Sequence, residues 1–458
     1  MGPALAAVCV LAAGPGALPA QAPPAAPPTV AAQAPRAQPL TLAQAHAIAL
    51  RNHPDIAAAN YRAQAEHQVF VQSRAGLLPR VDLYGSQVHA GAENTRLMAG
   101  GLNNPTVFSR TAIGAGVSQL ITDFGRTTNL VASSRLQASA ADQSARATRE
   151  QVLLEVDRSY FGALQAQGVQ AVARQTVDTR QLLLERVSIL AANKLKSELD
   201  VSFAQVGLED ARLLLERAQN DVDSTLAALS TVLGYREQRP FTLADEVAVP
   251  VPATADVAPL IEQALRDRPE LASLRDQRDA ALHLARSLRD ARLPTISAVL
   301  AAGDAPSHDV RLPDSYSAGG IQVSVPLFAG GFYQARQHEA ELRARAAAEA
   351  LRNVEDNVSR DVRIAWLSLN NARERLRTTA QLRRYAATAY DLADARYRAG
   401  SSSIVEVSQA QLALTAAQID ETTARYEVLI READLNYQIG VPAGVGAPPE
   451  DANSDSPP

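Results

Sequence analysis

The sequence predicts a mostly helical chain with a smaller β portion, built twice on one plan. Three observations predict this fold. No glycine occurs between Phe332 and Ala399 and no proline between Leu327 and Val441, so nothing there interrupts a helix. Blocks of residues recur at fixed offsets along the chain. Four short segments alternate apolar and polar side chains, which is typical of strands with one apolar face.

The helical run from Phe332 to Arg398 organises the rest of the chain. Ala, Arg, Leu and Glu dominate it, and all four favour helices. At a rise of about 1.5 Å per residue, a helix from 332 to 398 is roughly 100 Å long, whereas helices average about 11–12 residues. A rod of that length with one apolar stripe must pack against similar rods. The sequence supplies a second one, from Arg126 to about Ala191.

Composition excludes several classes of function. The net charge of −5 gives no basic surface for nucleic acid. Cys9 is the only cysteine, so neither a disulfide framework nor thiolate chemistry is expected. His46 and His53 lie seven residues apart, but Pro54 follows and no third ligand accompanies them. We find no nucleophile–base pair, and we expect no enzyme activity, no cofactor and no metal site.

The two ends of the chain are predicted to be unstructured or proteolytically processed segments. Residues 1–20 are expected to be a signal peptide, because they are short, apolar and rich in small residues, with a cleavage position after Ala20. Residues 21–40 are rich in Pro and Ala, and are expected to form a flexible N-terminus. Residues 442–458 are expected to form a disordered C-terminal tail. No run of about 18 apolar residues follows the leader, so we expect no apolar transmembrane helix.

An internal repeat is visible in the sequence. Residues 49–56 correspond to residues 264–271 at an offset of 215 (264 − 49). From Val117 to Gly234 the offset is 206, and no gap is needed. The nine-residue difference (215 − 206) falls between Pro79 and Val117, where we expect a loop. A match of that length without gaps indicates rods whose lengths must agree.

Each repeat is predicted to run helix, two strands, long helix, turn and returning helix. We place the first repeat at residues 41–234 and the second at residues 257–441. An equatorial linker, residues 235–256, joins them. Thr41 and Asp256 are suitable N-caps for the first helix of each repeat.

The strands are predicted at about 80–90 and 107–122 in the first repeat, and at about 294–303 and 316–328 in the second. In the last of them the residues Ile321, Val323, Val325 and Leu327 alternate with Gln322, Ser324 and Pro326. This is the pattern of a barrel strand that is apolar outside and polar inside. An ordinary half-buried sheet has the same pattern, so the strands alone leave both readings open.

Four strands cannot close a barrel. An open sheet edge in lipid leaves backbone groups unpaired, at a cost of several kcal/mol each. Eight strands make a barrel of about the width that side chains fill, whereas twelve strands leave an aqueous bore. If the strands lie in a membrane, three chains must therefore join. The predicted fold class is then a trimeric α/β-barrel duct, mostly helical, with a membrane β-barrel portion.

The sequence also resembles a known family. Residues 119–126 (QLITDFGR) look like the strand-to-helix signature of TolC-like outer-membrane efflux proteins, and residues 326–331 (PLFAGG) look like its counterpart in the second repeat. Residues 397–400 (YRAG), followed by residues 404–407 (IVEV), resemble the periplasmic turn of that family. The resemblance covers about residues 41–441.

The resemblance implies an exit duct in the bacterial outer membrane that extends into the periplasm. Such a duct is a homotrimer in a tripartite efflux or type I secretion system. It accepts substrates from a periplasmic adaptor (membrane fusion) protein and an inner-membrane pump of the RND, ABC or MFS type, and does no chemistry. The alternative is a soluble periplasmic coiled-coil scaffold or adaptor protein, which would explain the helices but not the strands.

The resemblance also assigns roles to the two helical turns. The predicted adaptor-contact tips are Asn193, Lys194, Lys196, Arg398, Gly400, Ser401 and Ser403. Lys194 and Lys196 are the only lysines in the chain, which favours a contact, although exposed loop charge is the simpler interpretation.

The predicted periplasmic gate consists of Asp200, Tyr397 and Glu406. The two acids could form a ring of six carboxylates in a trimer, two per chain, that favours cations. Alternatively, they could only stabilise the N-terminus of each returning helix. Gln409 stands where the family has a further acid, which predicts a weaker constriction. Tyr160 and Trp366 are predicted to be packing residues.

Overall fold

The computed structural model describes residues 39–89, 95–96, 106–107, 109–245, 256–307 and 314–441. All of them belong to one compact unit that begins at Pro39. The expected signal peptide, almost all of the expected flexible N-terminus and the expected tail lie outside the described residues, as do residues 246–255 of the expected linker.

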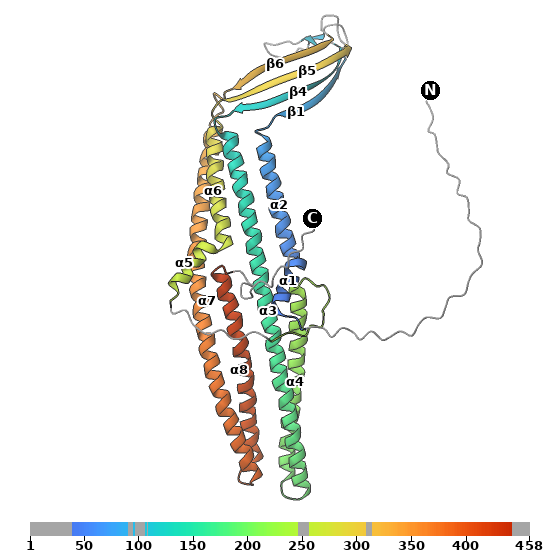
Figure 1. The fold of residues 1–458 in the computed structure, drawn as a ribbon, viewed down its shortest axis with the longest axis vertical. Coiled ribbons are helices and arrows are strands. Elements are labelled where there is room, and N and C mark those ends of the chain that lie inside the picture. Colours follow the sequence, from blue (N-terminus) through green and yellow to red (C-terminus); the bar gives the residue numbers. More distant parts are fainter. Residues whose placement is uncertain are drawn as a thin grey trace, which may run out of the picture. The chain divides into compact units, whose positions relative to one another are not determined.

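The described residues are mostly helical, with a small antiparallel sheet (Figure 1). The helices are α1 (Leu42–Asn52), α2 (Pro54–Ala75), α3 (Arg126–Ala192), α4 (Glu198–Val232), α5 (Ala258–Asp267), α6 (Pro269–Asp290), α7 (Phe332–Arg398) and α8 (Ile404–Gln438). The strands are β1 (Arg80–Val88), β2 (Thr95–Arg96), β3 (Thr106–Val107), β4 (Arg110–Thr122), β5 (Thr295–Ser307) and β6 (Ser315–Ser324). The helix predicted from Phe332 to Arg398 is confirmed, since α7 has the same bounds.

Helix lengths agree between the two halves of the chain. α3 and α7 each have 67 residues, α4 and α8 each have 35, and α2 and α6 each have 22. Proline opens both α2 and α6, because the first helical position needs no backbone N–H. Among the described residues, no helix is both long enough and apolar enough to cross a membrane.

Of the two predicted N-caps, one is confirmed and the other is wrong. Thr41 is the N-cap of α1 and forms a capping box with Gln44, as predicted. The prediction for Asp256 was wrong, because Val257 is the N-cap of α5. The Asp256 carboxylate still accepts a hydrogen bond from the backbone N–H of Ala258 at 3.1 Å, so it satisfies a free amide from one position further out.

The main sheet has the strand order β1-β4-β5-β6, and all three pairings are antiparallel. The register places the predicted apolar positions opposite one another: Val81 faces Val117, Val117 faces Leu300, and Ile296 faces Val323. One face is therefore apolar from edge to edge, and many of its side chains are exposed in the single chain. The opposite face carries mostly polar and small residues, including Asp82, Ser118, Gly303 and Gln322, together with Tyr84 and Val299.

Three strand ends differ from the prediction by three or four residues, and one of them is the start of β4 at Arg110 rather than at about 107. β6 ends at Ser324, four residues before the predicted end at 328, because Pro326 has no backbone N–H with which to continue a ladder. β5 continues to Ser307, four residues beyond the predicted 303, since its pairing with β6 extends to Asp304 and Ser315.

The helices form two different rows along their length. Next to the sheet, α3 packs between α2 and α6, and α6 packs against α7. Beyond α1 and α5 the order becomes α4-α3-α8-α7, which ends in the α3–α4 and α7–α8 turns (Figure 1). Tyr160 is fully buried in a core where α1, α3, α4 and α8 meet, and Trp366 packs against a core between α5, α7 and α8. Both are packing residues, as predicted.

Candidate functional site

The α3–α4 turn contains a non-glycine residue in the left-handed conformation. Lys194 has φ +60°, whereas Asn193 before it has φ −88°. The Asn193 side chain donates a hydrogen bond to the carbonyl oxygen of Ile189 at 2.8 Å, and the backbone N–H of Leu195 donates to Leu190 at 2.9 Å. These bonds satisfy carbonyl groups at the end of α3 and fix the sharp reversal.

The α7–α8 turn makes the same reversal with glycine. Gly400 has φ +76°, and the backbone N–H of Ser401 donates to the carbonyl oxygen of Arg396 at 2.9 Å. Arg398 forms an ion pair with Asp394 one turn back along α7. The two turns therefore have one geometry, reached with different residues.

Both predicted gate acids lie in the first turn of a returning helix. Ser197 is the N-cap of α4, and the Asp200 carboxylate accepts hydrogen bonds from its backbone N–H (3.0 Å) and hydroxyl group (2.8 Å). Ser403 is the N-cap of α8, and the Glu406 carboxylate lies 3.2 Å from Arg396 and accepts a hydrogen bond from Ser402. Each acid thus completes a helix N-terminus within its own chain.

Tyr397 is buried where the two hairpins meet. It is 2% exposed, in a core that also contains Val187, Ala204 and Val407. The Lys196 ammonium group lies 4.1 Å from the centroid of its ring, across the two hairpins. Burial raises the pKa of Tyr397, and the charge of Asp200 raises it further.

Of the ten predicted site residues, the structure brings Lys196, Tyr397 and Asp200 together. The other seven stay within their own turns: Asn193, Lys194, Arg398, Gly400, Ser401, Ser403 and Glu406.

Two charged residues of this region were missed by the sequence reasoning. The buried carboxylate of Asp394 lies 3.1 Å from Arg186 of α3 and also pairs with Arg398, so it joins the hairpins. Arg180 is buried on α3 and donates hydrogen bonds at 3.3 Å to the hydroxyl and carbonyl oxygens of Ser408 on α8. Burial lowers the pKa of Arg180. The sequence signal that could have identified them is a charged residue at a helix position where the repeat predicts a buried apolar one.

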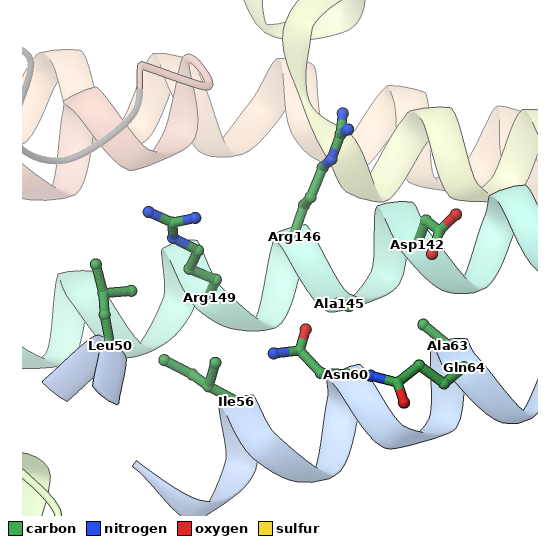
Figure 2. A pocket seen from close by; sticks show the side chains of 9 residues that line it. All are labelled: Leu50, Ile56, Asn60, Ala63, Gln64, Asp142, Ala145, Arg146 and Arg149. Atoms are coloured by element: carbon green, nitrogen blue, oxygen red, sulfur yellow. The ribbon is translucent and has the colours of Figure 1, made fainter. Parts of the chain in front are cut away.

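Several cavities lie along the described helices, and two of them bear on the site. One of about 300 Å³ lies between α4 and α8 and is lined by both apolar and polar side chains, with Arg180 among the polar ones. The other, of about 520 Å³, lies between α2 and α3 (Figure 2). Figure 2 shows Arg146 and Arg149 extending from α3 on the side away from α2, while Asn60 and Gln64 belong to α2. The residues that line this second cavity include no nucleophile beside a base, so it does not define an active site.

The fold is that of outer-membrane channel proteins. The solved structure of CusC superposes with a TM-score of 0.74 at 20% identity, and the match covers 87% of this chain and 92% of that one. The structure of VceC from Vibrio cholerae superposes with a TM-score of 0.73 at 17% identity, covering 87% and 96%.

The sequence matches the model of the outer membrane efflux protein family over residues 47–235 and 260–441, and the chain belongs to this family. Among its relatives, the outer membrane protein TolC of Vibrio cholerae is 23% identical over 87% of this chain and 90% of its own length. The pyoverdine export outer membrane protein OpmQ of Pseudomonas aeruginosa is 26% identical over 87% and 83%.

Family membership decides between the two classes left open by the sequence. The protein is an outer-membrane exit duct, and its place is the bacterial outer membrane, from which it extends into the periplasm. The family consists of transport proteins rather than enzymes.

Proposed function

We propose that three copies of this protein form a continuous duct in a tripartite efflux or type I secretion system. The observation that carries the proposal is the four-stranded sheet, whose edges β1 and β6 have no neighbour within the described chain. Its apolar face requires lipid on one side, and lipid does not tolerate open edges. Twelve strands from three chains close the wall and leave an aqueous bore.

The helical part of the duct follows from the same construction. Each half of the chain supplies two strands of the sheet, and its three longer helices have the same lengths as those of the other half. We interpret this as a two-fold repeat, residues 41–234 and 257–441, joined by the linker at residues 235–256. Six similar halves in a trimer would line one tube of nearly uniform wall.

We place the adaptor at the two helical turns. The contact residues are Asn193, Lys194, Lys196, Arg398, Gly400, Ser401 and Ser403. An inner-membrane pump of the RND, ABC or MFS type would then be connected through the adaptor. The names of two relatives support both kinds of system, since one is a pyoverdine export protein and another is the alkaline protease secretion protein AprF.

The periplasmic gate is proposed at Asp200, Tyr397 and Glu406. In a trimer the first turns of α4 and α8 bring together six carboxylates at the narrow end. Tyr397, buried between the hairpins, fixes the spacing of the two turns that carry these acids.

A fractionation and conductance experiment tests the proposal. The full chain is produced in a bacterium that lacks its own exit duct, and is extracted with detergent from outer-membrane fractions. We expect trimers, and discrete channels when they are added to planar bilayers. A dispersed monomer recovered from soluble periplasmic contents in plain buffer would contradict it.

A further inference from the structure

We propose that neighbouring copies join in the helical part through complementary charge, with the acidic outer face of α4 in one copy against the basic outer face of α7 in the next. The specific pairs are Glu209 with Arg384 and Glu216 with Arg377. This inference rests on the proposed trimer and identifies the surface that closes it.

The two faces are the free ends of a row of helices. Between the equatorial helices and the turns, the order is α4-α3-α8-α7. α4 therefore packs with α3 on one side, and α7 packs with α8 on one side. Within the described chain, the opposite side of each has no helix against it.

On α4 the outer face carries an apolar line beside an acidic line. Leu199, Val206 and Leu213 recur every seven residues and are all exposed. Leu213 lies two positions after the buried Ala211, about 200° around the helix, and so points away from α3, whereas Val206 also borders the cavity between α4 and α8. Beside this line a second one also recurs every seven residues: Glu209, Glu216 and Asp223.

On α7 the outer face carries an apolar line beside a basic line. Ile364, Tyr385 and Leu392 occupy one seven-residue repeat and are exposed, with Asn371 and Thr378 between them. Ile364 lies two positions after the fully buried Val362, and so points away from α8. Three arginines stand one position before the apolar line, Arg363, Arg377 and Arg384, and Asp391 occupies the same line next to the turn.

Net charge differs in sign between the two helices that carry these faces. α4 has seven acidic residues and two arginines, a net charge of −5 (2 − 7). Residues 366–398 of α7 have seven arginines and three acidic residues, a net charge of +4 (7 − 3). The side chains of Glu209 and Arg377 are 63% and 74% exposed, and each makes only a local pair three residues away. A second copy of this chain supplies the opposite charge to both.

Register brings specific residues to the same height. The contact of Lys196 with Tyr397 places the two turns side by side. Glu209 lies 13 residues from Lys196 (209 − 196), and Arg384 lies 13 residues from Tyr397 (397 − 384). Glu216 and Arg377 each lie 20 residues away. A rotational axis keeps equivalent residues of all copies at one height, so these pairs meet across the interface.

The relative direction of α4 and α7 brings the acidic line and the basic line to the same side of the contact. α4 begins at its turn and α7 ends at its turn, so the two helices are antiparallel. In an antiparallel pair of helices, residues at the same position of the seven-residue repeat lie on the same side of the contact. Charged residues beside the apolar contact line then determine which partner is favoured. The acidic line of α4 therefore faces the basic line of α7.

Charge reversal of the full chain in detergent tests the inference. We expect Glu209→Arg with Glu216→Arg to remove most of the trimer in native mass spectrometry at low salt, and Arg377→Glu with Arg384→Glu to do the same. All four changes together should restore it. Arg174→Glu with Asp178→Arg, at exposed positions on α3, is the matched control and should leave the trimer intact. A trimer that survives either paired reversal, or that is not restored by all four changes, would overturn the inference.

Cross-linking separates this inference from the proposed function. Leu213 lies 17 residues from Lys196 (213 − 196), and Gln381 lies 16 from Tyr397 (397 − 381). A chain with Leu213→Cys and Gln381→Cys should give covalent trimers on oxidation, and the paired reversals should prevent them. If the unmodified protein forms trimeric channels but these cysteines do not cross-link, the inference fails while the proposed function stands. If the unmodified protein forms no trimer, both the inference and the proposed function are refuted.

Discussion

The ammonium group of Lys196 lies 4.1 Å from the centroid of the Tyr397 ring, although the two residues belong to different helical hairpins. A cation over an aromatic face contributes about 0.5–1 kcal/mol at exposed sites and about 2 kcal/mol where it is desolvated. Tyr397 is buried, so this contact helps to hold the hairpins together. Lys194 makes no such contact within the described residues, and the two lysines therefore have separable roles.

Charge reversal of each lysine tests that separation. Lys194→Glu should weaken export while hydrogen exchange at the tips stays unchanged, because its charge makes no contact within the described residues and is proposed to face the adaptor. Lys196→Glu should weaken export and also speed amide exchange in both turns, because the contact with Tyr397 is lost. Lys196→Arg keeps a cation over the ring and serves as the control. Both variants should remain trimeric, and unchanged export in both would remove the lysines from the adaptor surface.

The left-handed position of each turn provides a matched pair of substitutions. A non-glycine residue in this conformation costs about 1–2 kcal/mol. Lys194→Gly should therefore slow hydrogen exchange at the amide of Leu195, which donates to Leu190. Gly400→Ala should speed exchange at the amide of Ser401 by a comparable factor. The two variants should change the exchange rates in opposite directions. A change in the same direction would show that backbone strain does not control the turns.

Much of the fold could be predicted from the sequence, because local signals set it. Gly331 and Gly400, both with positive φ, mark the ends of α7, and nothing between them breaks a helix. Alternation of side chains predicted one continuous apolar face on the sheet, and the register confirms it. The predicted end of β6 was wrong. The apolar alternation continues through Val325 and Leu327, but Pro326 between them cannot continue the ladder of hydrogen bonds.

The contacts of the candidate site could not be predicted in the same way. Lys196 and Tyr397 are 201 residues apart (397 − 196), and their contact depends on how one hairpin slides against the other. The same holds for the buried pair of His46 and Asp157, whose side chains lie 2.5 Å apart although they come from α1 and α3. A helical repeat shows which side of a rod is apolar, but does not show the register between rods.

The acidic residues of the first turns can be tested by removing charge alone. Asp200→Asn with Glu406→Gln removes both charges in each chain but keeps side-chain oxygens that accept hydrogen bonds. We expect higher single-channel conductance and lower cation preference in planar bilayers, since these changes would remove the proposed ring of carboxylates. The difference from the unmodified protein should shrink in about 1 M salt, where the Debye length is about 3 Å.

A second variant separates the ring from helix capping. Asp200→Ala with Glu406→Ala also removes the hydrogen bonds that the hydroxyl groups of Ser197 and Ser402 donate to these carboxylates, and loss of a helix cap costs about 1 kcal/mol. If conductance changes in the alanine variant but not in the amide variant, the acids act as caps and the ring is refuted.

Tyr426 anchors the segment that follows α4. Its hydroxyl group donates a hydrogen bond to the carboxylate of Asp245 at 3.1 Å, and Arg425 lies 3.2 Å from the same carboxylate. Burial, with the charge of Asp245 as the next contribution, raises the pKa of Tyr426 to about 12. The ordinary pKa of tyrosine is about 10.

This shift predicts how stability depends on pH. Between about pH 10 and 12, the unfolded chain has released the Tyr426 proton while the folded chain still holds it. The folded state then binds more protons, so the free energy of unfolding falls as pH rises through this window, and its contribution is fully present below pH 10. Tyr426→Phe should reduce the slope above pH 10. It should not abolish the slope, because burial also raises the pKa of Tyr397 and Tyr437.

The measurement is the midpoint of denaturant unfolding of the detergent-solubilised protein at intervals from pH 8 to pH 12. Tyr426→Phe should lie slightly below the unmodified protein at pH 8, because a hydrogen bond to a charged acceptor contributes about 1.5–3 kcal/mol. The two curves should then converge as pH rises. Tyr61→Phe, at a position 71% exposed on α2, is the control and should run parallel to the unmodified protein. Parallel curves for Tyr426→Phe would mean that the hydroxyl group loses its proton as readily in the folded chain as in the unfolded one, and the anchor on Asp245 would then have no role in alkaline stability.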